Sequence, residues 1–225
     1  MASEREKYLE DVLAQFLKPM KGIPFEVVVK SICNQSVEKF DPAAAASKKF
    51  LGKLSDAMTN ACKTVQNKPI ERYRPNEVGN DMESFVAQSL TALGLPTNPA
   101  KTKAGKGKTT GYPDLRVETD GLPVYLEVKT YAAANHDTTQ RSFYLSPAED
   151  HKVTEDAHHL LVGFEIEDRG ANGRKDNRGR ELRDYVPVAF VVVDLYGMEC
   201  DMKFEFNSDN KRLYDAERLL VEGRL

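Results

Sequence analysis

Cysteine is scarce in this chain, and long apolar runs are absent. The three cysteines, Cys33, Cys62 and Cys200, lie far apart and form no C-x-x-C pair. This spacing argues against a zinc knuckle and a disulfide framework, and it fits a reducing compartment. No segment approaches the roughly 20 apolar residues that span a bilayer, and the first residues are charged where a signal peptide would be apolar. We therefore expect a cytoplasmic protein with no membrane segment.

An excess of positive charge is missing as well. The net charge is −3 and the sequence pI is about 5.9, so the overall composition does not indicate a polyanionic partner. If the chain binds nucleic acid, its basic residues must be clustered. What is present is a 40% share of hydrophobic residues in 225 positions. That share is enough for one sizeable domain with a buried core.

The first third of the sequence predicts helices. Residues Glu4–Leu17 carry apolar side chains at helical spacing on one face. Asp41-Pro42 is typical of a helix start, and this helix is expected to run to about Gln66. The segment Pro24–Cys33 suits a buried strand as well as a helix. Residues 1–75 are thus predicted to form an N-terminal helical region.

The rest of the chain predicts a mixed sheet with helices. A helix from about Asp81 to Leu93 is expected to end at Gly94. Two alternating runs flank Asp120-Gly121 and predict a β-hairpin. Further predicted elements are strands at 142–146, 159–167, 186–196 and 202–207, and helices at 151–157 and 211–223. The fold class is therefore α/β or α+β, with a central mixed β-sheet flanked by helices in residues 76–225.

The predicted hairpin carries the chemistry. Glu127 and Lys129 are two residues apart on a strand and point to the same face, outward from the core, while Val128 points inward. The turn brings Asp114 back towards Glu127. Two adjacent carboxylates repel each other unless a cation lies between them, and Mg²⁺ is commonly bound by one or two carboxylates plus substrate phosphate. A neighbouring lysine can orient a water or neutralise developing charge, so this pattern suits phosphodiester hydrolysis.

Pro113-Asp114, followed after twelve residues by Glu127-Val128-Lys129, resembles the signature of the PD-(D/E)XK nuclease superfamily. The resemblance is closest to type II restriction endonucleases and covers roughly residues 76–195. It implies a restriction-endonuclease-like core and metal-dependent hydrolysis of DNA. It also implies that Asp114, Glu127 and the Val128 carbonyl bind the metal, and that Lys129 activates water or stabilises charge. Glu83 resembles the glutamate that many of these nucleases carry on the preceding helix.

A plainer interpretation of these residues exists. Glu127 and Lys129 could form a solvated ion pair on a strand face, worth a few tenths of a kcal/mol, and Glu83 could simply face solvent. Context favours the nuclease interpretation, because both halves of the motif fall on predicted strands, the turn chemistry fits, and a glutamate-bearing helix precedes them. His151 and Lys152 either face this site or cap a helix. His158 and His159 are adjacent on a strand and point in opposite directions, so we expect them to be structural.

Three polar segments are candidates for DNA contact. The loop before Pro113 supplies lysines for phosphates, or is a surface loop without a ligand. The span Arg169–Arg183 holds six cations and two acids, and it forms either a DNA-contacting loop with arginine and asparagine base contacts or a disordered insertion. The connection after the motif strand is the third. The candidate residues are Lys101, Lys103, Lys106, Lys108, Tyr131, His136, Gln140, Arg141, Asn172, Arg174, Lys175, Asn177, Arg178 and Arg180.

The favoured hypothesis is a type II restriction endonuclease that uses Mg²⁺ to cut double-stranded DNA at a specific short sequence. A homodimer would match a palindromic site, with residues 1–75 serving dimerisation or clamping the DNA. A repair endonuclease or junction resolvase with the same motif is the nearest alternative. A DNA-binding protein without catalytic activity is the other, although all three motif positions hold competent residues.

Overall fold

The computed structural model describes residues 3–16, 18, 20–105, 111–121, 123–132, 142–145 and 150–202. The chain divides into two compact units. The larger unit is Pro24–Met198, and the smaller one combines the two chain ends, Met1–Ile23 and Glu199–Leu225. In the smaller unit the Gly22 N–H donates to the Asp201 carboxylate at 3.0 Å, which ties the two ends of the chain together.

The helices are α1 (Glu4–Phe16), α2 (Phe25–Cys33), α3 (Ala45–Asn67), α4 (Val78–Ala92) and a short 3-10 helix, η1 (Pro75–Glu77). The strands are β1 (Ile23–Pro24), β2 (Val37–Glu38), β3 (Ile70–Arg72), β4 (Thr97–Pro99), β5 (Leu115–Val117), β6 (Val124–Tyr131), β7 (Ala157–Lys175), β8 (Glu181–Asp194) and β9 (Glu199–Cys200). None of the described helices is both long enough and apolar enough to cross a membrane.

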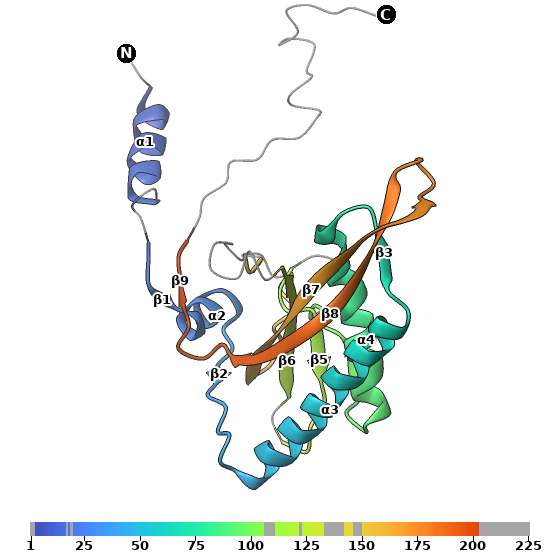
Figure 1. Cartoon of the computed structure of the whole chain (residues 1–225). Coiled ribbons are helices and arrows are strands. Elements are labelled where there is room, and N and C mark those ends of the chain that lie inside the picture. The colour runs from blue at the N-terminus through green and yellow to red at the C-terminus, as the bar shows by residue number, and fades with distance from the viewer. Residues whose placement is uncertain are drawn as a thin grey trace, which may run out of the picture. The chain divides into compact units, whose positions relative to one another are not determined.

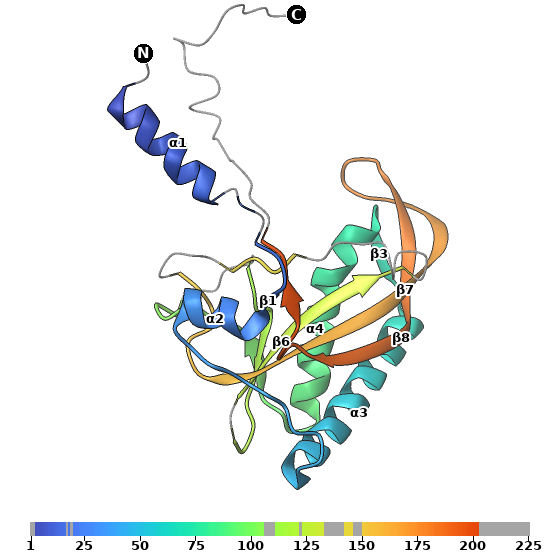
Figure 2. The ribbon, with the colours of Figure 1, turned by 90° about the vertical axis from the view of Figure 1, so that its left-hand side faces the viewer.

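A mixed seven-stranded sheet organises the larger unit. Its strand order is β3-β8-β7-β6-β5-β4, and β2 pairs with the beginning of β7. The pairs β6–β7 and β2–β7 are parallel, whereas the other pairs are antiparallel. Helices α3 and α4 cover one face, and α2 lies on the other (Figures 1 and 2). The predicted fold class, a mixed sheet flanked by helices, is confirmed.

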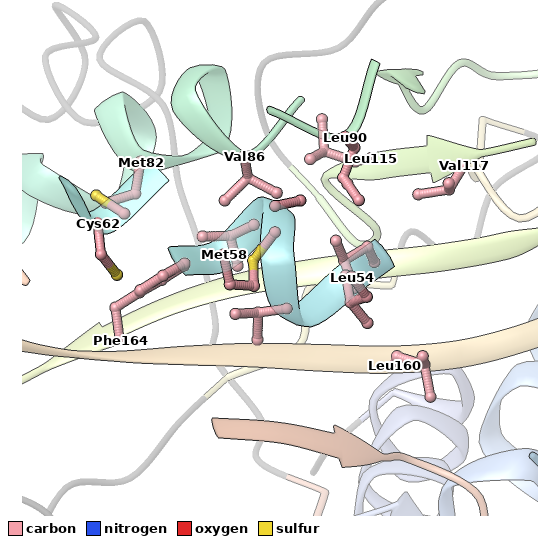
Figure 3. Close-up of a cluster of buried hydrophobic side chains, with 14 of the residues drawn as sticks. Leu54, Met58, Cys62, Met82, Val86, Leu90, Leu115, Val117, Leu160 and Phe164 are labelled. Carbon is pink, nitrogen blue, oxygen red and sulfur yellow. The ribbon is translucent and has the colours of Figure 1, made fainter. Parts of the chain in front are cut away.

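The core lies between the sheet and the helices α3 and α4. The buried residues recur at helical spacing, in one row on α4 and in two adjacent rows on α3, so each helix buries a single face. Figure 3 shows these rows packed against residues of β5 and β7. The buried residues labelled there are Leu54, Met58, Cys62, Met82, Val86, Leu90, Leu115, Val117, Leu160 and Phe164. Full burial of one such leucine contributes roughly 1.5–3 kcal/mol, which makes this layer the main support of the sheet.

The sequence predicts the cap at the C-terminal end of α4 correctly, but not the start of α3. Helix α3 begins at Ala45 rather than at Asp41-Pro42, because the Asp41 carboxylate accepts the Ala43 N–H at 2.9 Å and forms a turn before the helix. Helix α4 ends as predicted at Gly94, which has φ +73°. There the Gly94 N–H bonds to the Thr91 carbonyl and the Leu95 N–H to the Leu90 carbonyl, both at 3.0 Å. This is a Schellman motif.

The ambiguous segment of the first third is resolved. Within Pro24–Cys33, residues Phe25–Cys33 form the helix α2 and not a buried strand, and only Pro24 belongs to the two-residue strand β1. The connection between α3 and α4 contains the edge strand β3 and η1. The proposed division after residue 75 therefore falls inside the larger compact unit rather than between the two units.

Two predicted elements before β7 are wrong. Residues 142–145 form no strand, and residues 151–156 form no helix. The polar groups of the second segment bond to distant residues instead of along a helix: the Lys152 ammonium donates to the Pro113 carbonyl at 2.7 Å, and the Thr154 N–H to the Tyr125 hydroxyl at 3.0 Å. These tertiary contacts outweigh the helical pattern. The strand and the helix predicted beyond residue 202 lie outside the described residues.

The basic span Arg169–Arg183 is not a loop. Strands β7 and β8 continue through it as an antiparallel ribbon with β-bulges, and Lys175 pairs with Glu181. The five residues between the two strands form a turn in which the Asp176 carboxylate accepts the N–H groups of Arg178 and Arg180, at 2.8 and 2.9 Å. Figure 1 shows this β7–β8 hairpin projecting beyond the rest of the sheet.

Two glycine-to-alanine changes test the helix assignments. Gly94→Ala forces a side chain into a left-handed backbone conformation and should lower the free energy of unfolding by about 1–2 kcal/mol. Gly52→Ala lies inside α3 with nothing within 4 Å of the added methyl group, and it should raise that energy by about 0.5–1 kcal/mol. Urea unfolding of both variants measures the difference, and a shift in the same direction for both would contradict the α4 terminus described here.

Candidate active site

The pairing of β5 with β6 brings the motif residues together. Leu115 pairs with Leu126 and Val117 with Val124 in an antiparallel register. The position before Leu115, Asp114, therefore lies across from Glu127. A carboxylate oxygen of Asp114 accepts the Val128 N–H at 2.8 Å, which fixes this side chain against β6. The predicted hairpin is confirmed, although its connection, residues 118–123, is longer than a two-residue turn.

Glu127 is buried instead of facing outward. Glu127 is only 3% exposed. The expectation that it points outward into solvent is therefore wrong. One carboxylate oxygen, Oε1, accepts the Lys129 ammonium at 2.5 Å. The other, Oε2, is buried and has no hydrogen-bond partner among the described residues. A buried, half-satisfied carboxylate is costly, and it leaves a lone pair available for a ligand.

An aromatic cluster covers this face of the sheet. It consists of Phe25, Tyr112, Tyr125, Phe143 and His159, with ring centroids 5.1–5.9 Å apart. Tyr125 is two residues before Glu127 on β6 and pairs with His159 on β7. The Phe143 ring lies 5.8 Å from the Lys129 ammonium. The cluster thus excludes water from the inner side of the motif, which explains why Glu127 is buried.

The two histidines have separate surroundings. Burial lowers the pKa of His159 to about 3, so its ring is neutral. The Tyr112 hydroxyl lies 2.7 Å from its Nδ1 and remains protonated, since burial raises the pKa of Tyr112 well above its usual value. His158 instead contacts the Glu38 carbonyl at 2.9 Å through Nδ1. The two rings have different partners, as expected of structural residues.

Glu83 joins the motif carboxylates from α4. Burial, followed by the negative charges of Asp114 and Glu127, raises the pKa of Glu83 to about 7. Burial and the Asp114 charge likewise raise the pKa of Glu127, against the opposing effect of Lys129. Three acidic side chains from separate segments of the chain therefore lie within electrostatic reach of one another.

Lys152 is a second cation at the site. It is 5% exposed, and its ammonium donates to the Pro113 carbonyl, the residue just before Asp114. Its positive charge lowers the pKa of Glu83 and of Glu127, although less than the other causes raise them. Lys152 caps no helix, since residues 151–156 form none, and its charge acts on the carboxylates of the site. His151 instead bonds to the Val153 carbonyl at 2.7 Å and caps no helix.

A cleft of about 540 Å³ opens at these residues. Among the candidate residues it is lined by Glu83, Asp114, Val128, Lys129 and Tyr131. The sequence hypothesis did not include Asn76, Asn80, Asp168 and Tyr185, which also line the cleft. No motif marks these four, because they lie on separate elements and only the fold brings them together. The cleft joins the carboxylate cluster to solvent and can admit a phosphate group.

The available ligand atoms suit a metal ion that is bound by few protein groups, such as Mg²⁺, and not a site built from protein ligands alone. Among the described residues, no group of three or more His, Cys, Asp or Glu side chains could hold a metal ion alone. Two facing carboxylates with one unpartnered buried oxygen are compatible with Mg²⁺, which keeps several waters and takes further ligands from substrate phosphates. A cation beside Asp114 and Glu127 would also relieve the repulsion between them.

The candidate DNA-contacting residues are distributed over several places. Lys101 and Lys103 are exposed beside β4. In the β7–β8 hairpin, the Asn172 amide donates to Glu71 and Asp184, and Arg174 pairs with Glu71 at 2.6 Å. The exposed hairpin candidates are Arg174, Lys175, Asn177 and Arg178, whereas Arg180 is half-buried. The candidates Lys106, Lys108, His136, Gln140 and Arg141 lie outside the described residues.

Comparison with known proteins gives two matches. The sequence profile of the family described as "Type II restriction enzyme MjaV family" matches residues 19–217 of the chain. The chain is also 32% identical to the type II restriction enzyme MjaV of Methanocaldococcus jannaschii, in an alignment 235 positions long that covers 96% of each chain. Both matches extend over the elements that form the cleft.

The buried carboxylate predicts an unusual pH dependence of stability. Because the pKa of Glu127 is raised in the folded state, that state binds more protons than the unfolded chain once the pH exceeds the ordinary value of 4.5. Glu127 therefore lowers the free energy of unfolding as the pH rises. In metal-free buffer, Glu127→Gln should be more stable than the wild type by about 1–3 kcal/mol at about pH 8 and equal to it near pH 4.

The control for this measurement is Glu118→Gln, which removes an exposed carboxylate from the same hairpin. Urea unfolding across the pH range should show no comparable gain for this variant. A Glu127→Gln chain that is less stable than the wild type at about pH 8 would contradict the burial described for Glu127.

Proposed function

The chain belongs to the type II restriction enzyme MjaV family, and we propose that it is a type II restriction endonuclease. Its substrate is double-stranded DNA, in which it hydrolyses phosphodiester bonds at a specific short sequence. The observation that carries this proposal is that Asp114 and Lys129 line one cleft, while the buried Glu127 carboxylate pairs with Lys129 beside it. A cluster of carboxylates with a lysine beside it suits phosphodiester hydrolysis.

The proposed metal is Mg²⁺, held by the carboxylates of Asp114 and Glu127 and by the Val128 carbonyl. When bound, Mg²⁺ supplies Lewis-acid polarisation of the phosphodiester and a water of lowered pKa. The chain's own residues do the rest. Lys129 orients the attacking water and neutralises charge that develops on the phosphate. Glu83, a third carboxylate at the cleft, accepts the proton from that water.

Lys152 is assigned a positioning role. Its ammonium holds the Pro113 carbonyl at 2.7 Å, so it fixes the backbone from which Asp114 projects. A cation at this point also offsets part of the negative charge of the three acids before metal and DNA bind.

DNA contact is proposed for the exposed lysines beside β4 and for the β7–β8 hairpin. A two-stranded β-ribbon has the width to enter a major groove, and arginine suits both phosphate and guanine. A homodimer with one cleft per DNA strand would match a palindromic site. In such a dimer the N-terminal residues 1–75 supply subunit contacts or clamp the DNA.

Cleavage of phage DNA in the presence of Mg²⁺ tests the proposal. We expect discrete fragments. A smear would indicate a nuclease without sequence specificity, and preferential cutting of four-way junctions would indicate a resolvase. Retarded DNA that is never cut, across several divalent metals, would indicate a DNA-binding protein without catalytic activity.

Two aspartate variants of the same hairpin test the site assignment. Asp114→Ala should reduce cutting by at least about 100-fold while leaving DNA affinity much less affected, because it removes a metal ligand and not a DNA contact. Asp120→Ala removes an exposed aspartate of the β5–β6 connection and should cut like the wild type. If the Asp114→Ala chain cuts as fast as the wild type, the assignment of the metal ligands is wrong.

A further inference from the structure

A second hollow, of about 440 Å³, lies beside the tip of the β7–β8 hairpin. One side is formed by Arg72, Tyr73 and Arg74, which follow from β3 towards η1. The other side is formed by the hairpin tip with Arg178 and Arg180. We call this hollow the arginine groove. Its lining includes four arginines and two carboxylates, so it is positively charged although the chain as a whole is acidic.

Three of the four guanidinium groups are held in place. Arg72 makes a two-pronged pair with Asp81, at 2.6 and 2.7 Å. Arg180 pairs with Asp176 at 2.6 Å and stacks over the Tyr73 ring at 4.5 Å. The Arg74 side chain, 61% exposed, pairs with Glu77 at 3.2 Å. Ordered guanidinium groups lose little conformational entropy when they bind an anion, and their fork geometry matches phosphate oxygens.

Arg178 differs from the other three. It is exposed at the hairpin tip and makes no ion pair within the described part of the chain. Its backbone is nevertheless fixed, because its N–H donates to the Asp176 carboxylate at 2.8 Å. A cation without a partner on a fixed backbone is suited to an external anion.

The arginine groove adjoins the catalytic cleft. The helix η1 (Pro75–Glu77) contributes Pro75 and Asn76 to the cleft and Glu77 to the groove. The hairpin also connects them, since Asp168 and Tyr185 line the cleft and the tip lines the groove. A DNA duplex with one phosphate in the cleft can therefore extend along its backbone towards the groove, because each strand places a further phosphate about every 3.4 Å.

We propose that the arginine groove binds the phosphate backbone of duplex DNA next to the phosphate that is cut. This inference rests on the proposed function and adds to it a contact surface in which Arg74 and Arg178 carry sequence-independent binding. Arg72, Tyr73 and Arg180 form the fixed frame of that surface. The assignment differs from base readout by the hairpin, because it requires the same contribution on every DNA sequence.

Two arginine variants test the groove, each made in an Asp114→Ala parent that leaves DNA uncut. Arg74→Ala and Arg178→Ala should each weaken binding about 5- to 10-fold at about 0.1 M salt. Each should also reduce the slope of log affinity against log salt by about 1. The probes are a labelled duplex that contains the sequence cut by the wild type and a scrambled duplex of the same length. Both duplexes should be affected equally, as measured by fluorescence anisotropy.

Three controls show whether a loss of DNA affinity comes from the charge of the arginine, from its position in the arginine groove or from a loss of stability. Lys48→Ala removes one exposed positive charge from the first turn of α3, which lies at the other end of the larger unit from the hairpin tip (Figures 1 and 2). It should change neither affinity nor slope. Arg178→Lys should keep the salt slope, since the charge remains. Thermal unfolding of the arginine variants should match the parent, because an exposed pair such as Arg74–Glu77 contributes under about 1 kcal/mol.

Unchanged affinity and slope in both arginine variants would overturn the proposal, provided that the parent still binds DNA. A loss confined to the duplex that is cut would also overturn it, since that result identifies base readout. Failure of the proposed function looks different, because the unsubstituted chain would then fail to cut duplex DNA into discrete fragments, whatever the affinities of the arginine variants.

Discussion

Burial of the Glu127 carboxylate beside Asp114 is the constraint on which the active site depends. The β5–β6 register places the two acids across from each other, and the aromatic cluster removes water from Glu127. The Lys129 ammonium donates a hydrogen bond to one carboxylate oxygen of Glu127, and the other oxygen has no hydrogen-bond partner among the described residues. A buried polar group that lacks a hydrogen-bond partner destabilises the fold, and such groups are typical of sites that bind a ligand. Burial first, and then the neighbouring negative charges, raise the pKa values of Glu127 and Glu83, and a divalent cation would relieve the repulsion between these charges.

Side-chain packing on both faces of the sheet stabilises this arrangement. On one face, the leucine, valine and methionine rows of α3 and α4 stabilise the strands (Figure 3). On the other, Phe25 of α2 and Phe143 pack with Tyr112 and His159. Tyr112 immediately precedes the Pro113-Asp114 motif, so the aromatic packing and the position of Asp114 are linked through the chain. Stability and the geometry of the site therefore depend on the same contacts.

Much of the arrangement follows from local rules that a sequence displays. Period-two alternation and the Asp120-Gly121 turn signal predict the hairpin, and helical spacing predicts the buried rows of α3 and α4. The burial of Glu127 could not be predicted, because the side chains that cover it come from segments far away in the sequence. For the same reason the helical pattern at 151–156 failed: Lys152 and Thr154 bond to Pro113 and Tyr125 across the fold.

The β7–β8 hairpin was missed for a different reason. Its outer half packs against no hydrophobic layer, so its sequence shows no alternation of apolar residues and reads as a polar loop. The strand geometry is held instead by pairing between the two strands and by Asp176 at the turn. Arg72 and Tyr73 carry no motif either. They gain their place in the arginine groove only because β3 pairs with β8.

The position of the metal tests this account most directly. Crystals of the chain soaked with Mn²⁺, a substitute for Mg²⁺ with a measurable anomalous signal, would locate it. The account predicts a peak between the carboxylates of Asp114 and Glu127, within about 2.0–2.3 Å of one oxygen of each. A peak bound elsewhere, with Glu127 still paired only to Lys129, would contradict it.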